Sequence, residues 1–92
     1  TTLRGYGLTV HACVLRPKSR GRLDLADTDA ATKPRIEANY LGDAEGFDLR
    51  VMRECVRLSR EILAQPAFAA YRGEELFPGA KAQDDAAIDA FI

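Results

Sequence analysis

The chain has few of the residues that usually carry catalysis or metal binding. Its 92 residues include one histidine, His11, and two cysteines, Cys13 and Cys55. A catalytic role for His11 would need partners that the sequence does not identify, so we expect it to be structural or to line a pocket. One histidine and two distant cysteines match no familiar metal-ligand spacing. We expect two buried apolar thiols rather than a disulfide framework, and the residues assign no catalytic residue and no metal ligand.

Strong net charge and long apolar runs are also missing. Thirteen basic and 14 acidic residues give a formal net charge of -1, which provides no long-range field for nucleic acid or an anionic membrane. No apolar stretch approaches the roughly 20 residues of a membrane span, and no signal peptide opens the chain. We therefore predict no nucleic-acid partner, no membrane span and a soluble, reducing location, with a bacterial cytoplasm as the expected one.

Three short motifs could suggest a phosphate-binding loop or paired catalytic acids, but their sequence context does not support either. Gly5-Tyr6-Gly7 has neither a preceding strand nor a following helix, so it does not predict a phosphate loop. Glu74-Glu75 is typical of a solvated patch, and Asp84-Asp85 is typical of a helix start. We assign no cofactor-binding residue to any of them.

The first half of the chain has the alternation of β-strands. Apolar residues recur with a period of two over Gly7 to Leu15, and a second, one-sided pattern covers Arg22 to Ala26. Between them, Pro17 fixes its own φ, while Gly21 can adopt a positive φ. These features predict an antiparallel hairpin over Gly7 to Ala26.

The second half has the periodicity of helices. A polar loop at 27–34 and a short extended piece, Arg35 to Tyr40, lead to a predicted helix over Asp48 to Ala64. Asp43 or Asp48 can accept its first free amides, and Pro66 blocks its continuation. One apolar face of this helix is formed by Met52, Cys55, Val56, Ser59, Ile62 and Leu63. A second helix is expected to begin near Asp84, with a stripe of Ala87, Ile88, Phe91 and Ile92.

These elements predict the α+β class, with an antiparallel sheet covered by the long amphipathic helix and by the second, C-terminal helix. No repeat, low-complexity tract or change of composition divides residues 1–92, so we treat them as a single segment. The apolar stripe near Ile92 has no glycine cap or polar tail after it, and we expect the native polypeptide to continue.

Positive charge is concentrated between the two predicted strands. Arg16, Lys18, Arg20 and Arg22 alternate with other residues, and a loop carrying them could hold a phosphate or a carboxylate. The other interpretation is a solvated turn whose arginines pair with nearby acids, namely Asp24, Asp27 or Asp29.

Four segments in order carry a family resemblance. They are Arg16-Pro17-Lys18-Ser19-Arg20-Gly21, Pro34-Arg35-Ile36-Glu37-Ala38-Asn39-Tyr40-Leu41, Arg60-Glu61-Ile62-Leu63-Ala64-Gln65-Pro66-Ala67-Phe68 and Tyr71-Arg72-Gly73-Glu74-Glu75-Leu76-Phe77-Pro78-Gly79. Together they resemble the C-terminal, substrate-side region of glucose-methanol-choline (GMC) oxidoreductases, and choline dehydrogenase-like members are the most similar. The resemblance covers roughly Gly7 to Ile92.

The resemblance implies that the chain is part of the substrate-binding domain of an FAD-dependent enzyme, which takes hydride from a primary alcohol. The family's glycine-rich FAD-binding domain and its catalytic histidine lie outside the matching segments, so no catalytic or flavin-contacting residue is carried over. The implied partners are the rest of the polypeptide and a small alcohol, and Gly7 to Leu15 would line or support the substrate cavity. Alone, the chain is expected to bind no FAD and to be inactive.

Two alternatives stay open. One is an independent binding module that uses the Arg16 to Arg22 loop for an anionic partner, with affinity that falls as salt rises. The other is a structural piece that forms oligomers through exposed sheet edges.

Overall fold

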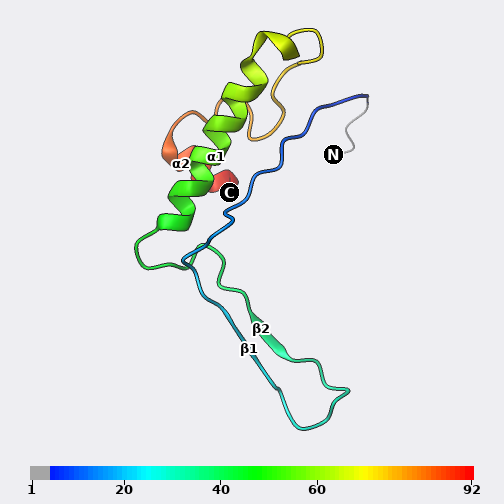
Figure 1. The fold of residues 1–92 in the computed structure, drawn as a ribbon, viewed down its shortest axis with the longest axis vertical. Helices are drawn as coiled ribbons and strands as arrows, with labels where there is room; N and C mark the ends of the chain where they lie inside the picture. Colours follow the sequence, from blue (N-terminus) through cyan, green and yellow to red (C-terminus); the bar gives the residue numbers. More distant parts are fainter. Residues whose placement is uncertain (1–4) are drawn as a thin grey trace.

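The structure is a computed structural model, and it describes residues 5–92 (Figure 1). Its elements are the strands β1 (Arg22–Asp24) and β2 (Arg35–Glu37), the helix α1 (Phe47–Ala64), the 3₁₀ helix η1 (Pro66–Phe68) and the helix α2 (Asp85–Phe91). Two antiparallel strands and two helices confirm the α+β class. None of the described helices is long and apolar enough to cross a membrane.

The two strands form a short hairpin. Arg22 stands opposite Glu37 in the antiparallel register, and the Arg22 Nε lies 2.9 Å from a Glu37 carboxylate oxygen. Two aspartates turn the polar loop between the strands, because Asp27 accepts a hydrogen bond from Asp29 N at 2.7 Å and Asp29 accepts one from Ala31 N at 3.0 Å. Such side-chain turns are what this composition favours.

The predicted hairpin over Gly7 to Ala26 is wrong in its pairing. The strand that begins at Arg22 exists, but its partner is β2, which lies in the piece predicted only as extended. Gly7 to Leu15 runs as extended chain with no assigned strand, and Leu8 and Leu15 are exposed. The alternation correctly indicated an extended chain. It could not indicate a partner, because among the described residues none forms a ladder with this segment.

Helix α1 begins and ends close to the predicted residues. The Asp43 carboxylate accepts hydrogen bonds from Phe47 N at 2.6 Å and Asp48 N at 3.1 Å, which confirms its expected role at the helix start. Gly46 provides the φ of 61° at the residue before the helix. At the other end Pro66 opens η1 as its first residue, so the chain turns instead of continuing α1.

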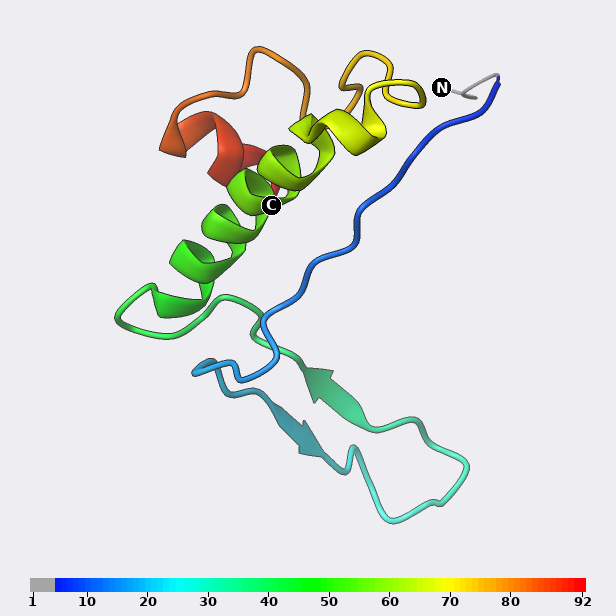
Figure 2. The same ribbon diagram turned by 45° about the horizontal axis from the view of Figure 1, so that its top comes forward.

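The helices pack on each other rather than on the sheet. Ile88 of α2 is fully buried, and Arg53 of α1 contacts both acids of α2, with Nε and Nη2 on Asp89 at 2.7 and 2.6 Å and Nη1 on Asp85 at 2.7 Å. The hairpin projects away from the helical pair in both views (Figure 1, Figure 2). The predicted cover of the sheet by helices is therefore wrong, while the amphipathic helix itself is confirmed.

The described chain is elongated. Its extents are 57 × 34 × 22 Å and its radius of gyration is 18.1 Å, whereas a compact domain of this length has about 12 Å. Buried apolar side chains are confined to Ala82 and Ile88 among the described residues. This fold positions a small helical unit and an open hairpin on either side of one junction.

Candidate functional site

The junction lies where the basic loop meets the start of α1, and we define it as Lys18, Ser19 and Asp48. The Asp48 carboxylate accepts three hydrogen bonds, from Lys18 N at 2.8 Å, from Ser19 N at 2.9 Å and from Ser19 Oγ at 2.5 Å. Ser19 Oγ in turn accepts a hydrogen bond from Asp43 N at 3.2 Å. The loop is therefore held by backbone and side-chain donors that converge on one carboxylate.

Asp48 is charged although it is only 1% exposed. Burial raises the pKa of the Asp48 carboxyl, but the Ser19 hydroxyl, the two backbone amides and the nearby Arg20 outweigh burial and hold that pKa below its ordinary value. A buried carboxylate is tolerated when its oxygens are fully hydrogen-bonded, and here the junction supplies those bonds.

The Lys18 side chain reinforces the junction from the solvent side. Its Nζ lies 2.8 Å from the Glu45 carboxylate and 4.7 Å from the centre of the Phe47 ring. The hydrogen bond and the charge of Lys18 lower the pKa of the Glu45 carboxyl. Both Lys18 and Glu45 are exposed, so this ion pair adds less than the buried bonds to Asp48.

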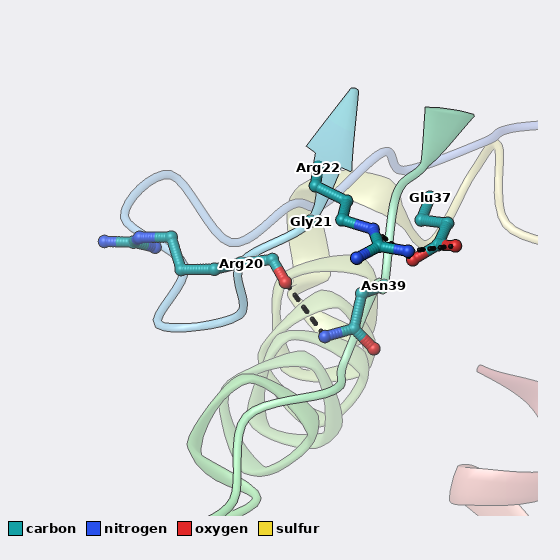
Figure 3. Close-up of a pocket in the computed structure, with 5 residues that line it drawn as sticks. All are labelled: Arg20, Gly21, Arg22, Glu37 and Asn39. Carbon is teal, nitrogen blue, oxygen red and sulfur yellow. Dashed lines mark hydrogen bonds and ion pairs between the residues drawn. The ribbon is translucent and has the colours of Figure 1, made fainter. Parts of the chain in front are cut away.

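A shallow hollow of about 550 Å³ lies beside the junction, at the base of the hairpin (Figure 3). It is lined by Arg20, Gly21, Arg22, Glu37 and Asn39. Asn39 donates from Nδ2 to the Arg20 carbonyl oxygen at 2.9 Å, which fastens the end of β2 to the loop. A Cβ on Gly21 would stand 2.2 Å from the Glu37 carbonyl oxygen, so this position needs glycine for close approach. Its φ is not positive, so the positive φ that glycine permits is not what this position uses.

The basic side chains of the loop do not converge on a common point. Arg22 pairs with Asp24 at 3.1 Å as well as with Glu37, and Arg20 donates to the carbonyl oxygens of Pro17 and Ser19. The Arg20 side chain points away from Arg22 in Figure 3. This arrangement supports the solvated turn, with Asp24 as one of the expected partners, over a preformed anion site.

The other candidate residues are dispersed. His11 and Cys13 are exposed and Cys55 is half-buried, so the prediction of two buried thiols is wrong. The extended segment that contains Cys13 has no covering element among residues 5–92. Residues 5–92 contain no cluster of three or more potential metal ligands.

The acidic pairs have structural partners. Asp84 caps α2 by accepting a hydrogen bond from Ala87 N at 2.8 Å, as predicted, and Asp85 bonds to Arg53 and Arg57. Glu75 is not simply solvated, because it accepts hydrogen bonds from Arg60 of α1 at 3.0 Å. These contacts fix the loop and α2 on α1.

Sequence reasoning missed the main role of Asp48. It treated Asp48 as a possible cap, whereas its carboxylate binds a loop 29 and 30 residues earlier. A signal was present, because Asp48 lies four residues before Met52 and therefore continues the apolar face of α1. An acid in that stripe indicates a buried polar contact.

Comparison with known proteins defines the class. The family model described as GMC oxidoreductase matches residues 17–92. The match begins in the basic loop and includes the whole junction, both strands and both helices. This chain belongs to the GMC oxidoreductase family, as the four sequence segments predicted.

Within this family, the chain is similar to choline dehydrogenases and to a choline oxidase. Over 88 residues the chain is 47% identical to an oxygen-dependent choline dehydrogenase of Photobacterium profundum, which covers 96% of the chain. It is 44% identical over 90 residues, or 98% of the chain, to the oxygen-dependent choline dehydrogenase of Paraburkholderia phymatum. It is 42% identical over all 92 residues to the choline oxidase of Arthrobacter globiformis. The chain spans only about 15 to 16% of the length of these relatives.

Proposed function

We propose that this chain is a substrate-domain segment of a larger FAD-dependent alcohol oxidoreductase that resembles choline dehydrogenase. In the complete enzyme, hydride would pass from a primary alcohol to the flavin. The single observation that carries the proposal is the family match over residues 17–92. Relatives that are named as a choline dehydrogenase and a choline oxidase support choline as the alcohol.

The exposed apolar surface supports a missing neighbour. Tyr6, Leu15 and Tyr40 have exposed fractions of 86% or more, and Leu25 of the hairpin reaches 82%. Exposure of this many large apolar side chains is typical of a surface that another part of a protein covers. We propose that the remainder of the same polypeptide covers them, with Gly7 to Leu15 on the substrate side.

Residues 5–92 do not fit FAD by themselves. A dinucleotide needs a glycine-rich strand-to-helix turn for its diphosphate, and no helix follows Gly5 or Gly7. The hollow at the hairpin and a second one of about 390 Å³ along α1 are both open to solvent. We therefore place the flavin and the catalytic base on other parts of the enzyme, and propose that this segment alone neither binds FAD tightly nor turns over substrate.

Location and assembly follow from the same proposal. The relatives named above are bacterial, and we propose a bacterial cytoplasmic enzyme. The strands β1 and β2 each have one unpaired edge in the described chain, and these edges would pair with the rest of the polypeptide or with a second copy.

The test is flavin reduction in the full-length protein. The purified protein is mixed anaerobically with choline, and the visible flavin band is followed. We expect the band to bleach with choline and to persist with choline O-methyl ether, which has the same cation but no oxidisable hydroxyl group. A colourless protein, or a flavin that both compounds leave oxidised, would contradict the proposed function.

A further inference from the structure

Two consecutive residues connect the two halves of the described chain. Every hydrogen bond and ion pair between residues 5–42 and residues 43–92 has one end at Lys18 or Ser19. The hairpin is closed by its own contacts, and the helices are held by theirs. Within residues 5–92, the polar contacts that orient the first half on the second are therefore all made at the junction or by the adjoining Lys18 side chain.

We propose that Ser19 and Asp48 are positioning residues for the alcohol substrate. Their contact fixes the loop at Ser19 on the start of α1, and so sets the direction in which the preceding segment, residues 7–15, extends from that loop. The inference rests on the proposed function, in which this segment lies on the substrate side. We assign neither residue a catalytic role, because the catalytic base is proposed to lie on other parts of the enzyme. Their effect passes through the backbone of residues 15–19.

The geometry of the junction suits this role. Two successive backbone amides, of Lys18 and Ser19, donate to the two oxygens of one carboxylate, which fixes both the position and the direction of the chain there. The Ser19 hydroxyl adds a third bond and links to Asp43, which itself holds the start of α1. The contact is thus attached to the helix in two ways, directly through the Asp48 carboxylate and indirectly through the backbone amide of Asp43, whose own carboxylate holds the start of α1.

A small change of chain direction at Ser19 can displace residues several positions away. Nine extended residues span roughly 30 Å. In the complete enzyme the direction at the junction would decide where this segment meets the parts of the polypeptide that cover it, and misplacement of about 1 Å is enough to slow a well-oriented reaction strongly. A change at Ser19 can therefore reach a substrate that it does not touch.

The experiment uses the full-length enzyme and four variants. Ser19→Ala removes the hydroxyl, Asp48→Asn replaces one accepting oxygen by a donor, and Ser19→Thr keeps the hydroxyl. The matched control is Asp85→Asn, which also neutralises a carboxylate on a helix but loosens the α1 and α2 contact and leaves the junction intact. Flavin content, kcat/KM for choline, the thermal midpoint and hydrogen exchange of peptides covering residues 7–15 are measured on each.

We expect Ser19→Ala and Asp48→Asn to lower kcat/KM for choline about tenfold and to speed exchange in 7–15, with flavin content retained. Ser19→Thr should have a kcat/KM for choline within about twofold of that of the unsubstituted enzyme. Asp85→Asn should lower the thermal midpoint but leave kcat/KM for choline and hydrogen exchange in residues 7–15 unchanged. The proposal is overturned if Asp85→Asn matches the junction variants, or if those variants leave kcat/KM and exchange unchanged.

The two hypotheses can fail separately. If the unsubstituted enzyme does not oxidise choline, the proposed function fails, and hydrogen exchange alone then decides the junction. Faster exchange in 7–15 for Ser19→Ala but not for Asp85→Asn supports control of the segment by the junction, and equal exchange overturns it.

Discussion

Asp48 combines near-complete burial with a charge, and its neighbours explain how. An isolated buried carboxylate becomes neutral, because desolvation raises its pKa. Here three donors and the nearby Arg20 reverse that direction. The same hydrogen bonds hold the loop at the junction. The charge of Asp48 and the position of the loop therefore depend on the same contacts.

A pH dependence follows from the depressed pKa of Asp48. The sign is that of a carboxyl whose folded pKa lies below its unfolded value, so the stabilisation is present above about pH 3.8 and is lost as pH falls through the folded pKa. We expect the difference in thermal midpoint between the full-length enzyme and Asp48→Asn to stay constant from about pH 8 to 5 and to shrink below the ordinary pKa. Differential scanning calorimetry across that range checks it. A difference that changes around neutral pH would contradict the assignment.

The role of Asp43 as the cap of α1 can be tested by two substitutions. Asp43→Ala removes the acceptor of two amides at the start of α1 and should cost about 1 kcal/mol in the free energy of unfolding, whereas Asp43→Asn should keep most of the cap. Denaturant unfolding of the two variants measures the difference. Equal losses in both would mean that the charge, rather than the hydrogen bonding, matters at this position.

At the scale of elements, the hairpin depends on a close backbone approach. A Cβ at Gly21 would stand 2.2 and 2.5 Å from the carbonyl oxygens of Glu37 and Ala38. Gly21→Ala should therefore separate the base of β1 from β2 and speed hydrogen exchange in both strands. Gly73→Ala is the control, because a Cβ there would meet nothing within 4 Å. Unchanged exchange in Gly21→Ala would show that the strands do not pair as described.

The contact between α1 and α2 depends on Arg53. Its side chain is 16% exposed and forms hydrogen bonds with Asp89 and Asp85, and the bond to Arg53 lowers the pKa of Asp89. Arg53→Gln should lower the thermal midpoint by several degrees, because it leaves Asp89 half-buried without its partner. Arg50→Gln on the exposed face, where Arg50 reaches only the Glu45 carbonyl oxygen, should change it little. Similar midpoints for both variants would contradict a structural role for the Arg53 contacts.

Sequence patterns predicted local structure well and pairing poorly. The period of α1, the caps at Asp43 and Asp84 and the stop at Pro66 are local properties, and the structure confirms them. The partner of the strand at Arg22 is a non-local choice, so the pattern could not distinguish Gly7 to Leu15 from β2. The junction was missed for the same reason, since its atoms come from residues about 30 positions apart.

At the scale of the whole molecule, the described chain buries too little surface to be a self-sufficient domain. Its accessible surface is 7960 Å², whereas a compact protein of 10.1 kDa exposes about 5,300 Å². Leu23, Leu25 and Ile36 on the hairpin all have exposed fractions above 60%. A surface of this kind fits a segment that folds against the remainder of a GMC oxidoreductase.

The most direct measurement compares flavin in the 92-residue chain with flavin in the full-length protein. Both are expressed with excess riboflavin, purified in the same way and examined by visible absorption. We predict a flavin spectrum that choline bleaches in the full-length protein and no bound flavin in the segment. A flavin spectrum that co-purifies with the 92-residue chain, or a full-length protein without flavin, would contradict the account.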